Sequence, residues 1–253
     1  MAVYDEAAER IVVHVVYDGP AWAGKTTNLE QLCGFFTEHR RSKLYTTGNS
    51  TRRTVYLDWL QLEGGLIQGQ KLRCHLITVP GQTVLARRRW YLLKRADVIV
   101  FVLDSTPSGL EEARTMFDSM QRFAAEQSPP LPVIVQANKQ DRPGALEPHQ
   151  IARTLMLDPA LVVPANAPSG SGVRETTVLA IRAAANMVQK HILAHGLHSL
   201  AGVSCNGEQL RDQIEAEERE DPKSPFEVVL ANTARAEPGM PKPKGTEPPP
   251  LPR

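Results

Sequence analysis

Glycine, lysine and hydroxyl residues fall at a spacing that suits phosphate binding in residues 19–26. This segment reads Gly-Pro-Ala-Trp-Ala-Gly-Lys-Thr, with four residues between its two glycines. Successive backbone N–H groups of such a loop, together with the N-terminus of a following helix, hold phosphate oxygens. The Lys25 ammonium would reach the β- and γ-phosphates, and the Thr26 hydroxyl would be a ligand of Mg²⁺. The alternative interpretation is a glycine-containing turn between a strand and a helix.

A second polar segment, residues 138–141 (Asn-Lys-Gln-Asp), follows the apolar stretch 133–137. The Asp141 carboxylate can accept hydrogen bonds from N1–H and the exocyclic amine of guanine, and adenine lacks both groups. Each buried polar group left unpaired costs ~1–3 kcal/mol, so such a pair selects strongly for guanine. The Asn138 side chain can also bond guanine, and the Lys139 stem can pack over the purine face. A polar turn after a strand is the alternative.

The elements that must position these segments alternate along the chain. The β-branched stretch 11–17 predicts a buried strand that runs into the phosphate-binding segment. The apolar run 97–103 predicts another strand that is covered on both faces. The other predicted strands cover residues 54–60, 71–79, 133–137 and 161–163, and the predicted helices cover residues 26–39, 84–94, 111–126, 148–155 and 172–195. This order predicts an α/β fold with a doubly wound, mostly parallel six-stranded sheet and one antiparallel edge strand.

Composition excludes several classes of protein. Of the 253 residues, 42% are hydrophobic and 23% are charged, as in soluble globular proteins. With a net charge of +1, the protein has no overall electrostatic field that would attract nucleic acid or an anionic membrane. There is no apolar run of membrane-spanning length, export signal or lipidation site, so we expect no intrinsic membrane anchor. The scattered cysteines 33, 74 and 205 are typical of reduced thiols in a cytoplasmic protein.

The character of the sequence changes near residue 198. Residues 1–197 are predicted to be one folded domain, and residues 198–253 a charged, then proline-rich tail that is largely disordered. Residues 209–221 are dense in Glu and Arg and predict a solvated helix. Nine of the twenty prolines lie in residues 222–252, a composition that cannot bury enough apolar surface to become ordered. The three arginines 87–89 also predict a solvated helix face, in preference to a site for an acidic partner or lipid headgroups.

Taken together, residues 19–26, 80–82 (Pro-Gly-Gln) and 138–141 resemble the motifs of a Ras-like small GTPase. Residues 19–20, 25–28, 53–54 and 75–82 further resemble the bacterial gliding-motility and cell-polarity GTPases of the MglA type. The resemblance covers about the first three-quarters of the chain and stops before the tail. It implies the P-loop small-GTPase fold for residues 1–197 and makes this segment a GTPase (G) domain.

The resemblance also implies roles for individual residues. Thr26 and Thr54 would hold Mg²⁺, Gly81 would sense the γ-phosphate, and Gln82 would orient the attacking water. Arg53 would neutralise charge in the transition state, an effect worth roughly 10³–10⁵ in rate. The residues implied to contact the nucleotide are Gly19, Ala21, Trp22, Ala23, Gly24, Lys25, Thr26, Thr27, Thr54, Gly81, Asn138, Lys139, Asp141, Asn166, Ala167 and Pro168.

Two positions depart from the usual pattern of small GTPases. Thr78 stands where most members have an acidic residue that holds Mg²⁺ through a water molecule, although the MglA-type subgroup resembles this chain in having Thr there. Ala21 stands where the family usually has Gly. Its Cβ would project toward the space that Gln82 and an arginine need, so we expect hydrolysis to be slow without an activating protein.

These observations predict a small GTP-binding switch that hydrolyses GTP to GDP and phosphate. The resemblance implies a Roadblock-type activating protein of the MglB kind, together with polarity or motility effectors, and no nucleic acid partner. We expect a cytoplasmic protein that partners recruit to a cell pole or the inner membrane surface. The alternative is a slow or inactive nucleotide-binding scaffold that recruits partners through its switch surface and tail. A P-loop kinase ranks last, because it leaves residues 138–141 unexplained.

Overall fold

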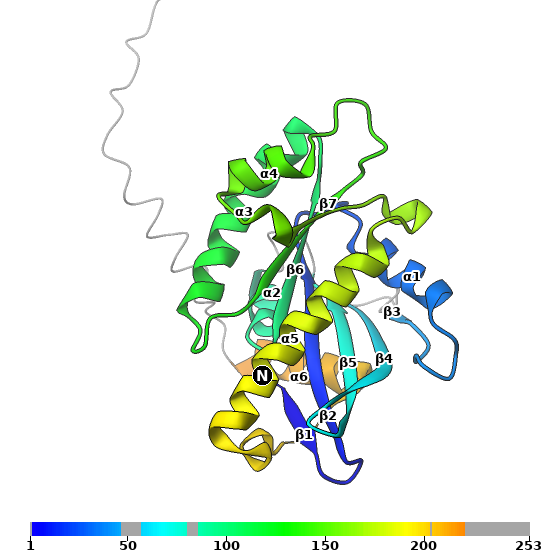
Figure 1. Cartoon of the computed structure of the whole chain (residues 1–253), viewed down its shortest axis with the longest axis vertical. Helices are drawn as coiled ribbons and strands as arrows, with labels where there is room; N and C mark the ends of the chain where they lie inside the picture. Colours follow the sequence, from blue (N-terminus) through cyan, green and yellow to red (C-terminus); the bar gives the residue numbers. More distant parts are fainter. Residues whose placement is uncertain (1, 47–56, 80–85, 203, 221–253) are drawn as a thin grey trace, which may run out of the picture.

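An eight-stranded sheet forms the centre of the molecule, with helices on both faces (Figure 1). The computed structural model describes residues 2–46, 57–79, 86–202 and 204–220. The strands are β1 (Val3–Asp5), β2 (Arg10–Asp18), β3 (Tyr45–Thr46), β4 (Asp58–Ile67), β5 (Gln70–Thr78), β6 (Val98–Asp104), β7 (Val133–Asn138) and β8 (Val162–Pro164). The α-helices are α1 (Lys25–Phe35), α2 (Ala86–Leu93), α3 (Pro107–Glu126), α4 (Pro148–Leu155), α5 (Val173–His195) and α6 (Gly207–Glu220), and short 3₁₀ helices are η2 (Pro159–Leu161), η3 (Ala167–Ser169) and η4 (Leu197–Leu200).

The strand order is β3-β4-β5-β2-β6-β7-β8, and β1 pairs with β2 outside this path. Strand β2 runs parallel to β5 and β6, and β6, β7 and β8 continue the parallel arrangement. Strand β4 is antiparallel to β5, as the sequence predicts, and the two-residue β3 extends this side of the sheet by one more antiparallel strand. The predicted fold class is therefore confirmed. The structure adds β1 and β3, whose three and two residues are too few to give a recognisable pattern.

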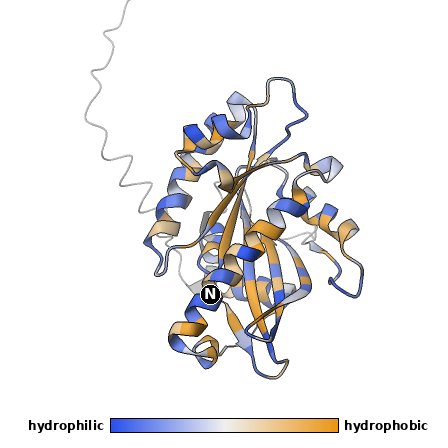
Figure 2. Cartoon of the chain, viewed as in Figure 1, coloured by the Kyte–Doolittle hydropathy of each residue, from blue (hydrophilic) through white to orange (hydrophobic). Residues whose placement is uncertain are grey.

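The sheet has an apolar core on each face, as the orange strands and the blue outer surfaces of the helices in Figure 2 show. Strand β2 serves both cores because alternate side chains of a strand point to opposite faces. Its Val13 and Val15 pack with residues of α1 and α5, and its Val16 packs on the other face, with α2, α3, α4 and α6. Among the described helices, none combines the length and the apolar composition that crossing a bilayer requires.

Helix α6 lies beyond the predicted domain boundary at residue 197, yet it belongs to one of these cores. Leu210 and Ile214 are each 1% exposed and join the cluster that contains Leu92 of α2 and Trp59 of β4. The sequence predicts the helix correctly, but the prediction that it is solvated is wrong on the side that faces the sheet. The boundary itself and the disorder of the tail remain predictions, since residues 221–253 lie outside the described ranges.

Helix α2 is joined to β2 by a buried ion pair. The Arg89 guanidinium donates to both carboxylate oxygens of Asp18, with Nε–Oδ1 and Nη2–Oδ2 distances of 2.8 and 2.7 Å. The prediction of a solvated arginine face is therefore wrong for Arg88 and Arg89, which are 7% and 6% exposed. Asp18 is fully buried at the end of β2, and a buried carboxylate requires a charged or hydrogen-bonding partner.

We expect Arg89→Met to lower the free energy of unfolding by about 3–5 kcal/mol, because it leaves the Asp18 carboxylate buried without its counter-charge. Urea denaturation measures this loss. Arg114→Met on the exposed side of α3 is the matched control and should change stability little. The double variant Asp18→Asn/Arg89→Met should be more stable than Arg89→Met alone; an equal or larger loss would contradict this explanation.

His75 gives a second prediction, because its ring is buried and both of its nitrogens lack a hydrogen-bond partner among the described residues. Burial, together with the neighbouring His14 and Arg73, lowers the pKa of His75 to about 3. The unfolded chain, with a His pKa near 6.5, therefore binds more protons than the folded chain between these two values. The contribution of neutral His75 to the free energy of unfolding is fully present above about pH 6.5. It falls with decreasing pH, by up to about 1.4 kcal/mol per pH unit.

The variant His75→Phe should flatten this dependence. We expect urea denaturation between pH 7 and pH 4 to give a shallower decline for His75→Phe than for the unmodified chain. The exposed His149 of α4 offers the same substitution as a control, and His149→Phe should keep the original slope. Equal slopes for all three proteins would show that another group controls acid sensitivity.

Candidate functional site

Residues 19–26, here called the phosphate loop, connect β2 to α1 at the carboxyl end of the strand. Both glycines of the pattern are required by their surroundings. Gly19 has a φ of 135°, and a Cβ there would lie 2.0 Å from the carbonyl oxygen of Val102. Gly24 has a φ of 104°, and its Cβ would lie 2.3 Å from Nδ2 of Asn138. The loop therefore has the conformation and the position, at the start of α1, that phosphate binding needs.

The Lys25 side chain lies across this loop. Its Nζ donates hydrogen bonds to the carbonyl oxygens of Gly19 at 2.8 Å and Pro20 at 2.7 Å. Burial lowers the pKa of Lys25 to about 8, and the nearby Asp18 carboxylate opposes this shift. The ammonium is therefore still mostly protonated at neutral pH. A phosphate group in the loop would favour its charged form further, since an opposite charge close by raises the pKa of a lysine.

Asp58 joins the Thr26 hydroxyl to the end of β5. Its Oδ2 accepts hydrogen bonds from Thr26 Oγ1 at 2.6 Å and from Thr78 Oγ1 at 3.0 Å. The backbone N–H of Asp58 also donates to Thr78 Oγ1 at 3.0 Å. Because the Thr26 hydrogen points to Asp58, the lone pairs of its oxygen remain free for a metal ion. This set of hydroxyl and carboxylate oxygens fits Mg²⁺, which prefers oxygen ligands.

The sequence analysis missed Asp58. The available signal is an acidic residue inside the otherwise apolar predicted strand 54–60, where a buried carboxylate needs a specific partner. That partner could not be identified from sequence, because Thr26 and Asp58 meet only when β4 lies beside β5 and the start of α1. The position that lacks an acidic residue, Thr78, contacts the carboxylate supplied by the next strand.

Residues 138–141, the guanine motif, begin with the buried Asn138 at the end of β7 and meet the phosphate loop. Asn138 Nδ2 donates to the carbonyl oxygen of Ala23 at 2.7 Å, and Asn138 Oδ1 accepts from the backbone N–H of Ala167 at 2.9 Å. One side chain thus connects the phosphate loop to residues 166–168, here called the base loop. The structure therefore brings together three segments that the sequence analysis assigned to the same nucleotide. The fourth residue of the motif, Asp141, is exposed at its end.

Lys139 is held by Asp104, the last residue of β6. Lys139 has a φ of 63°, and its Nζ donates to Asp104 Oδ2 at 2.9 Å; Arg142 Nη1 donates to the same oxygen at 3.0 Å. Burial by itself would raise the pKa of Asp104, but hydrogen bonds from Lys139 and Thr106 outweigh it, and the pKa lies below its usual value. Asp104 therefore stays ionised at neutral pH and fixes the direction of the Lys139 stem.

Behind these loops lies a buried amide network that the sequence analysis did not identify. Asn28 Nδ2 donates to the carbonyl oxygen of Gly24 at 2.9 Å and to Gln136 Oε1 at 2.8 Å. Gln136 Nε2 donates to Asn28 Oδ1 at 2.8 Å and to Thr176 Oγ1 at 3.0 Å. The network joins α1, β7 and α5, which carry or flank the three loops. A fully hydrogen-bonded network of this kind holds its elements in one arrangement.

Other predicted site residues lie around the loop or outside the described ranges. Ala21 is half-buried, and the Trp22 side chain is 91% exposed with a φ of 63°. The carbonyl oxygen of Pro168 accepts a hydrogen bond from Gln31 Nε2 of α1 at 3.0 Å. The four residues assigned to the switches and to hydrolysis fall outside the described residues, so their roles remain predictions: Arg53, Thr54, Gly81 and Gln82.

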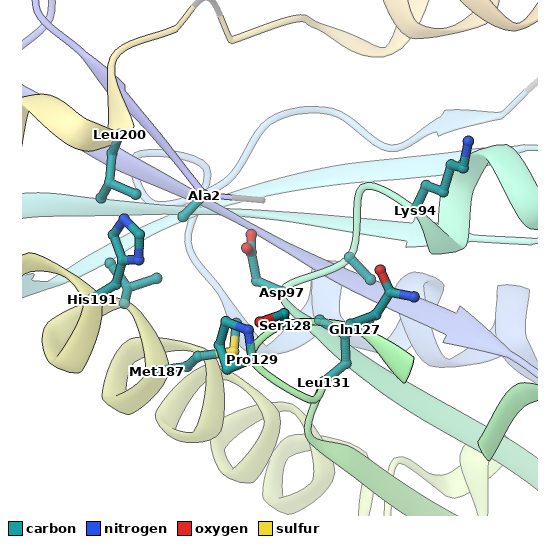
Figure 3. A pocket seen from close by; sticks show the side chains of 12 residues that line it. Ala2, Lys94, Asp97, Gln127, Ser128, Pro129, Leu131, Met187, His191 and Leu200 are labelled. Carbon is teal, nitrogen blue, oxygen red and sulfur yellow. The ribbon is translucent and has the colours of Figure 1, made fainter. Parts of the chain in front are cut away.

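A cavity of about 90 Å³ lies at the end of the sheet that is opposite to the phosphate loop (Figure 3). Its lining includes Asp97 and Leu131, which precede β6 and β7, and Met187 and His191 of α5. It is therefore at the amino ends of strands whose carboxyl ends carry Asp104 and the guanine motif. Ligand pockets usually measure about 300–1,000 Å³, so this cavity is too small for a nucleotide.

The chain is similar in sequence to known proteins. Residues 8–200 match the ADP-ribosylation factor family. The chain is 34% identical to mutual gliding-motility protein MglA of Myxococcus xanthus (strain DK1622) over 179 residues, which are 70% of this chain and 92% of that protein. It is 36% identical to human ADP-ribosylation factor-like protein 4C over 171 residues (64% and 82%) and 33% identical to mouse ADP-ribosylation factor-like protein 4D over 144 residues (56% and 65%).

The family match runs from just before β2 to the end of η4. It therefore includes the phosphate loop, Asp58 and Thr78, the guanine motif and the base loop, whereas α6 lies beyond it. The geometry of the site and the extent of the match agree: the chain belongs to the ADP-ribosylation factor family, as a small GTPase of the MglA type.

Proposed function

We propose that this protein is a switch that binds GTP, hydrolyses it to GDP and phosphate, and presents two conformations to its partners. The observation that carries the proposal is the Asn138 side chain, which joins the phosphate loop to the base loop through hydrogen bonds of 2.7 and 2.9 Å. These contacts fix the phosphate loop, which would hold the phosphates, relative to the base loop, which would hold the base. Such a spacing suits a guanine nucleotide better than a free phosphate or a nucleobase.

In this proposal, Lys25, Thr27 and the backbone N–H groups of the phosphate loop bind the phosphates. Thr26 and Thr54 supply hydroxyl ligands for Mg²⁺, and the Asp58 carboxylate orients the Thr26 hydroxyl from behind. Bound Mg²⁺ would neutralise charge on the phosphate oxygens. Asp58 would then take the place of the acidic residue that Thr78 replaces, since its carboxylate already contacts both hydroxyl groups.

For hydrolysis, Gln82 would orient the attacking water and Arg53 would neutralise charge in the transition state. Gly81 would sense the γ-phosphate. An arginine in this role contributes roughly 10³–10⁵ in rate. The Ala21 methyl group would crowd the space that Gln82 and Arg53 need. We therefore expect slow turnover by the protein alone and faster turnover with an activating protein.

Similarity to MglA supports a proposal for the biological context. We infer a Roadblock-type, MglB-like activating protein and effectors in cell polarity or gliding motility as partners. They would read the difference between the GTP and GDP states in the segments on either side of β4 and β5. The protein would reside in the cytoplasm, and its partners would recruit it to a cell pole or the inner membrane surface.

A nucleotide-binding scaffold with little turnover is the second candidate, because Ala21 stands where the family usually has glycine. Multiple-turnover GTP hydrolysis, measured with and without a Roadblock-type protein, separates the two functions. A switch should release phosphate faster when the activating protein is present. A scaffold should bind GTP with no turnover under either condition.

Guanine selection gives the sharpest test of the proposed function. In calorimetry, we expect the unmodified protein to bind GTP and GDP but not ATP. Asp141→Asn should weaken GTP binding by about 2–4 kcal/mol, because two hydrogen bonds to the charged carboxylate are lost. It should also improve binding of xanthine nucleotides. Asp118→Asn, an exposed residue of α3, is the matched control. Unchanged selectivity in Asp141→Asn would overturn the assignment of a guanine site.

The proposed role of Asp58 gives a separate prediction. Asp58→Asn keeps the size of the side chain but removes its charge, so we expect nucleotide retention to require a higher Mg²⁺ concentration, roughly 10- to 100-fold. Release of fluorescent GDP at a series of Mg²⁺ concentrations measures this effect. Adding Thr78→Asp to Asp58→Asn restores a carboxylate from the neighbouring strand and should recover part of the Mg²⁺ dependence. A Mg²⁺ curve unchanged in Asp58→Asn would remove Asp58 from the metal site.

A further inference from the structure

Helix α6 occupies a groove between β4 and α2, beyond the residues that match the family. Leu210 and Ile214 insert into the apolar cluster there, and each is 1% exposed. Gly207 lies so close to the strands that a Cβ would be 3.0 Å from the Tyr45 ring and 3.4 Å from Cβ of Trp59. In Figure 1, α6 lies behind the sheet, on the face opposite α5.

The start of this helix is fixed to the domain. Asn206 and Gln209 form reciprocal hydrogen bonds of 2.9 Å that cap its first turn. Just before it, Ser204 Oγ donates to Asp5 Oδ2 at 3.2 Å, and Ala201 forms a bridge with Tyr4 of β1. The segment is thus tethered at one end, and the helix extends across the groove from that point.

Beyond this first turn, the described side chains of the helix divide into an inward and an exposed set. Its inward residues 207, 210 and 214 recur at the spacing of one helical face, and Arg211 Nη1 donates to the Tyr45 hydroxyl at 3.4 Å. Residues 208, 209, 212, 213 and 216 are exposed. Among the side chains of α6 that the structure describes, two are apolar and buried, and they must offset the conformational entropy of ordering a fourteen-residue helix, so the net preference for the docked helix is small. A contact of this strength can open and close while the domain stays folded.

Both walls of the groove are connected to the phosphate site. Strand β4 begins at Asp58, whose carboxylate accepts from the Thr26 hydroxyl at 2.6 Å. Helix α2 carries Arg89, which binds the Asp18 carboxylate directly before the phosphate loop. A helix that packs on β4 and α2 together therefore restrains two elements whose side chains are bonded to residues at both ends of the phosphate loop.

We propose that α6 is an intrachain latch, which docks between β4 and α2 and slows the release of the bound nucleotide. This proposal rests on the proposed function in one respect only, namely that the ligand released is a guanine nucleotide. Undocking of α6 loosens both walls, and its re-docking closes them. By thermodynamic reciprocity, a ligand that favours one arrangement of β4 and α2 also shifts the docking equilibrium of α6.

The test uses the full chain with Leu210→Asp/Ile214→Asp, which replaces both apolar anchors of α6 by charges. The matched control is Gln213→Asp/Ala216→Asp, which adds the same charge to the exposed side of the same helix. Hydrogen exchange should show loss of amide protection in α6 of the first variant and not in the control. Release of fluorescent GDP should be about fivefold faster or more in the first variant. It should stay within about twofold of the unmodified protein in the control.

A synthetic peptide of residues 204–220, added to the first variant, should bind and return GDP release to the original rate. The same peptide carrying Asp at positions 210 and 214 should do neither. An unchanged release rate in a variant whose α6 has lost amide protection would overturn the latch. Failure of the peptide to bind would overturn the groove as its docking site.

Two further measurements keep the outcomes distinct. Leu210→Ala/Ile214→Ala weakens docking with less risk to folding, and it should give a smaller increase in release that the same peptide reverses. Fluorescence anisotropy of labelled peptide on the first variant needs no nucleotide. If the protein binds no guanine nucleotide, the proposed function fails while peptide binding still tests the docking groove. If nucleotide binds normally but α6 has no effect, only the latch fails.

Discussion

One carboxamide group determines how the two halves of the site are arranged. The Asn138 side chain is 1% exposed and presents a donor and an acceptor in a fixed plane, so it can satisfy a carbonyl group on one loop and an N–H on another. Neither a carboxylate nor an apolar residue of this size could do both. Gly24 is matched to it, because a Cβ there would lie only 2.3 Å from Nδ2. The phosphate loop and the guanine motif are therefore structurally dependent on each other.

The elements around the site are connected by different kinds of contact. The amide network of Asn28, Gln136 and Thr176 fixes α1, β7 and α5 through buried, mutually satisfied hydrogen bonds. Elsewhere, Arg89 joins α2 to β2 through an ion pair, Asp58 joins β4 to the start of α1 through a hydrogen bond, and two apolar side chains of α6 pack in the same core as α2 and β4. The amide network therefore lies under the base loop, whereas the contacts of Arg89 and Asp58 lie beside the segments that would respond to the γ-phosphate.

Much of the fold could be predicted from the sequence because its signals are local. Continuous apolar strands, alternating helices and glycine-containing turns are each contained in a short stretch, and the guanine motif is four consecutive residues. The contributions of Asp58, Asp104 and Arg89 could not be predicted, since each depends on a partner that only the folded sheet brings close. The burial of α6 was missed for a related reason: two apolar residues in a charged segment give a weak pattern until a groove for them is known.

The tryptophans have a practical consequence for optical experiments. Trp22 stands in the phosphate loop with 91% of its surface exposed. Trp59 is 6% exposed, with its ring 5.0 Å from that of His75 and its Cβ beside Gly207 at the start of α6. The fluorescence of an exposed indole, such as that of Trp22, has its maximum at a longer wavelength than the fluorescence of a buried indole, such as that of Trp59. Two of the three tryptophans, Trp22 and Trp59, therefore lie in distinct surroundings, while Trp90 is the third. Their separate emission wavelengths can report an event at the phosphate loop and an event beneath α6.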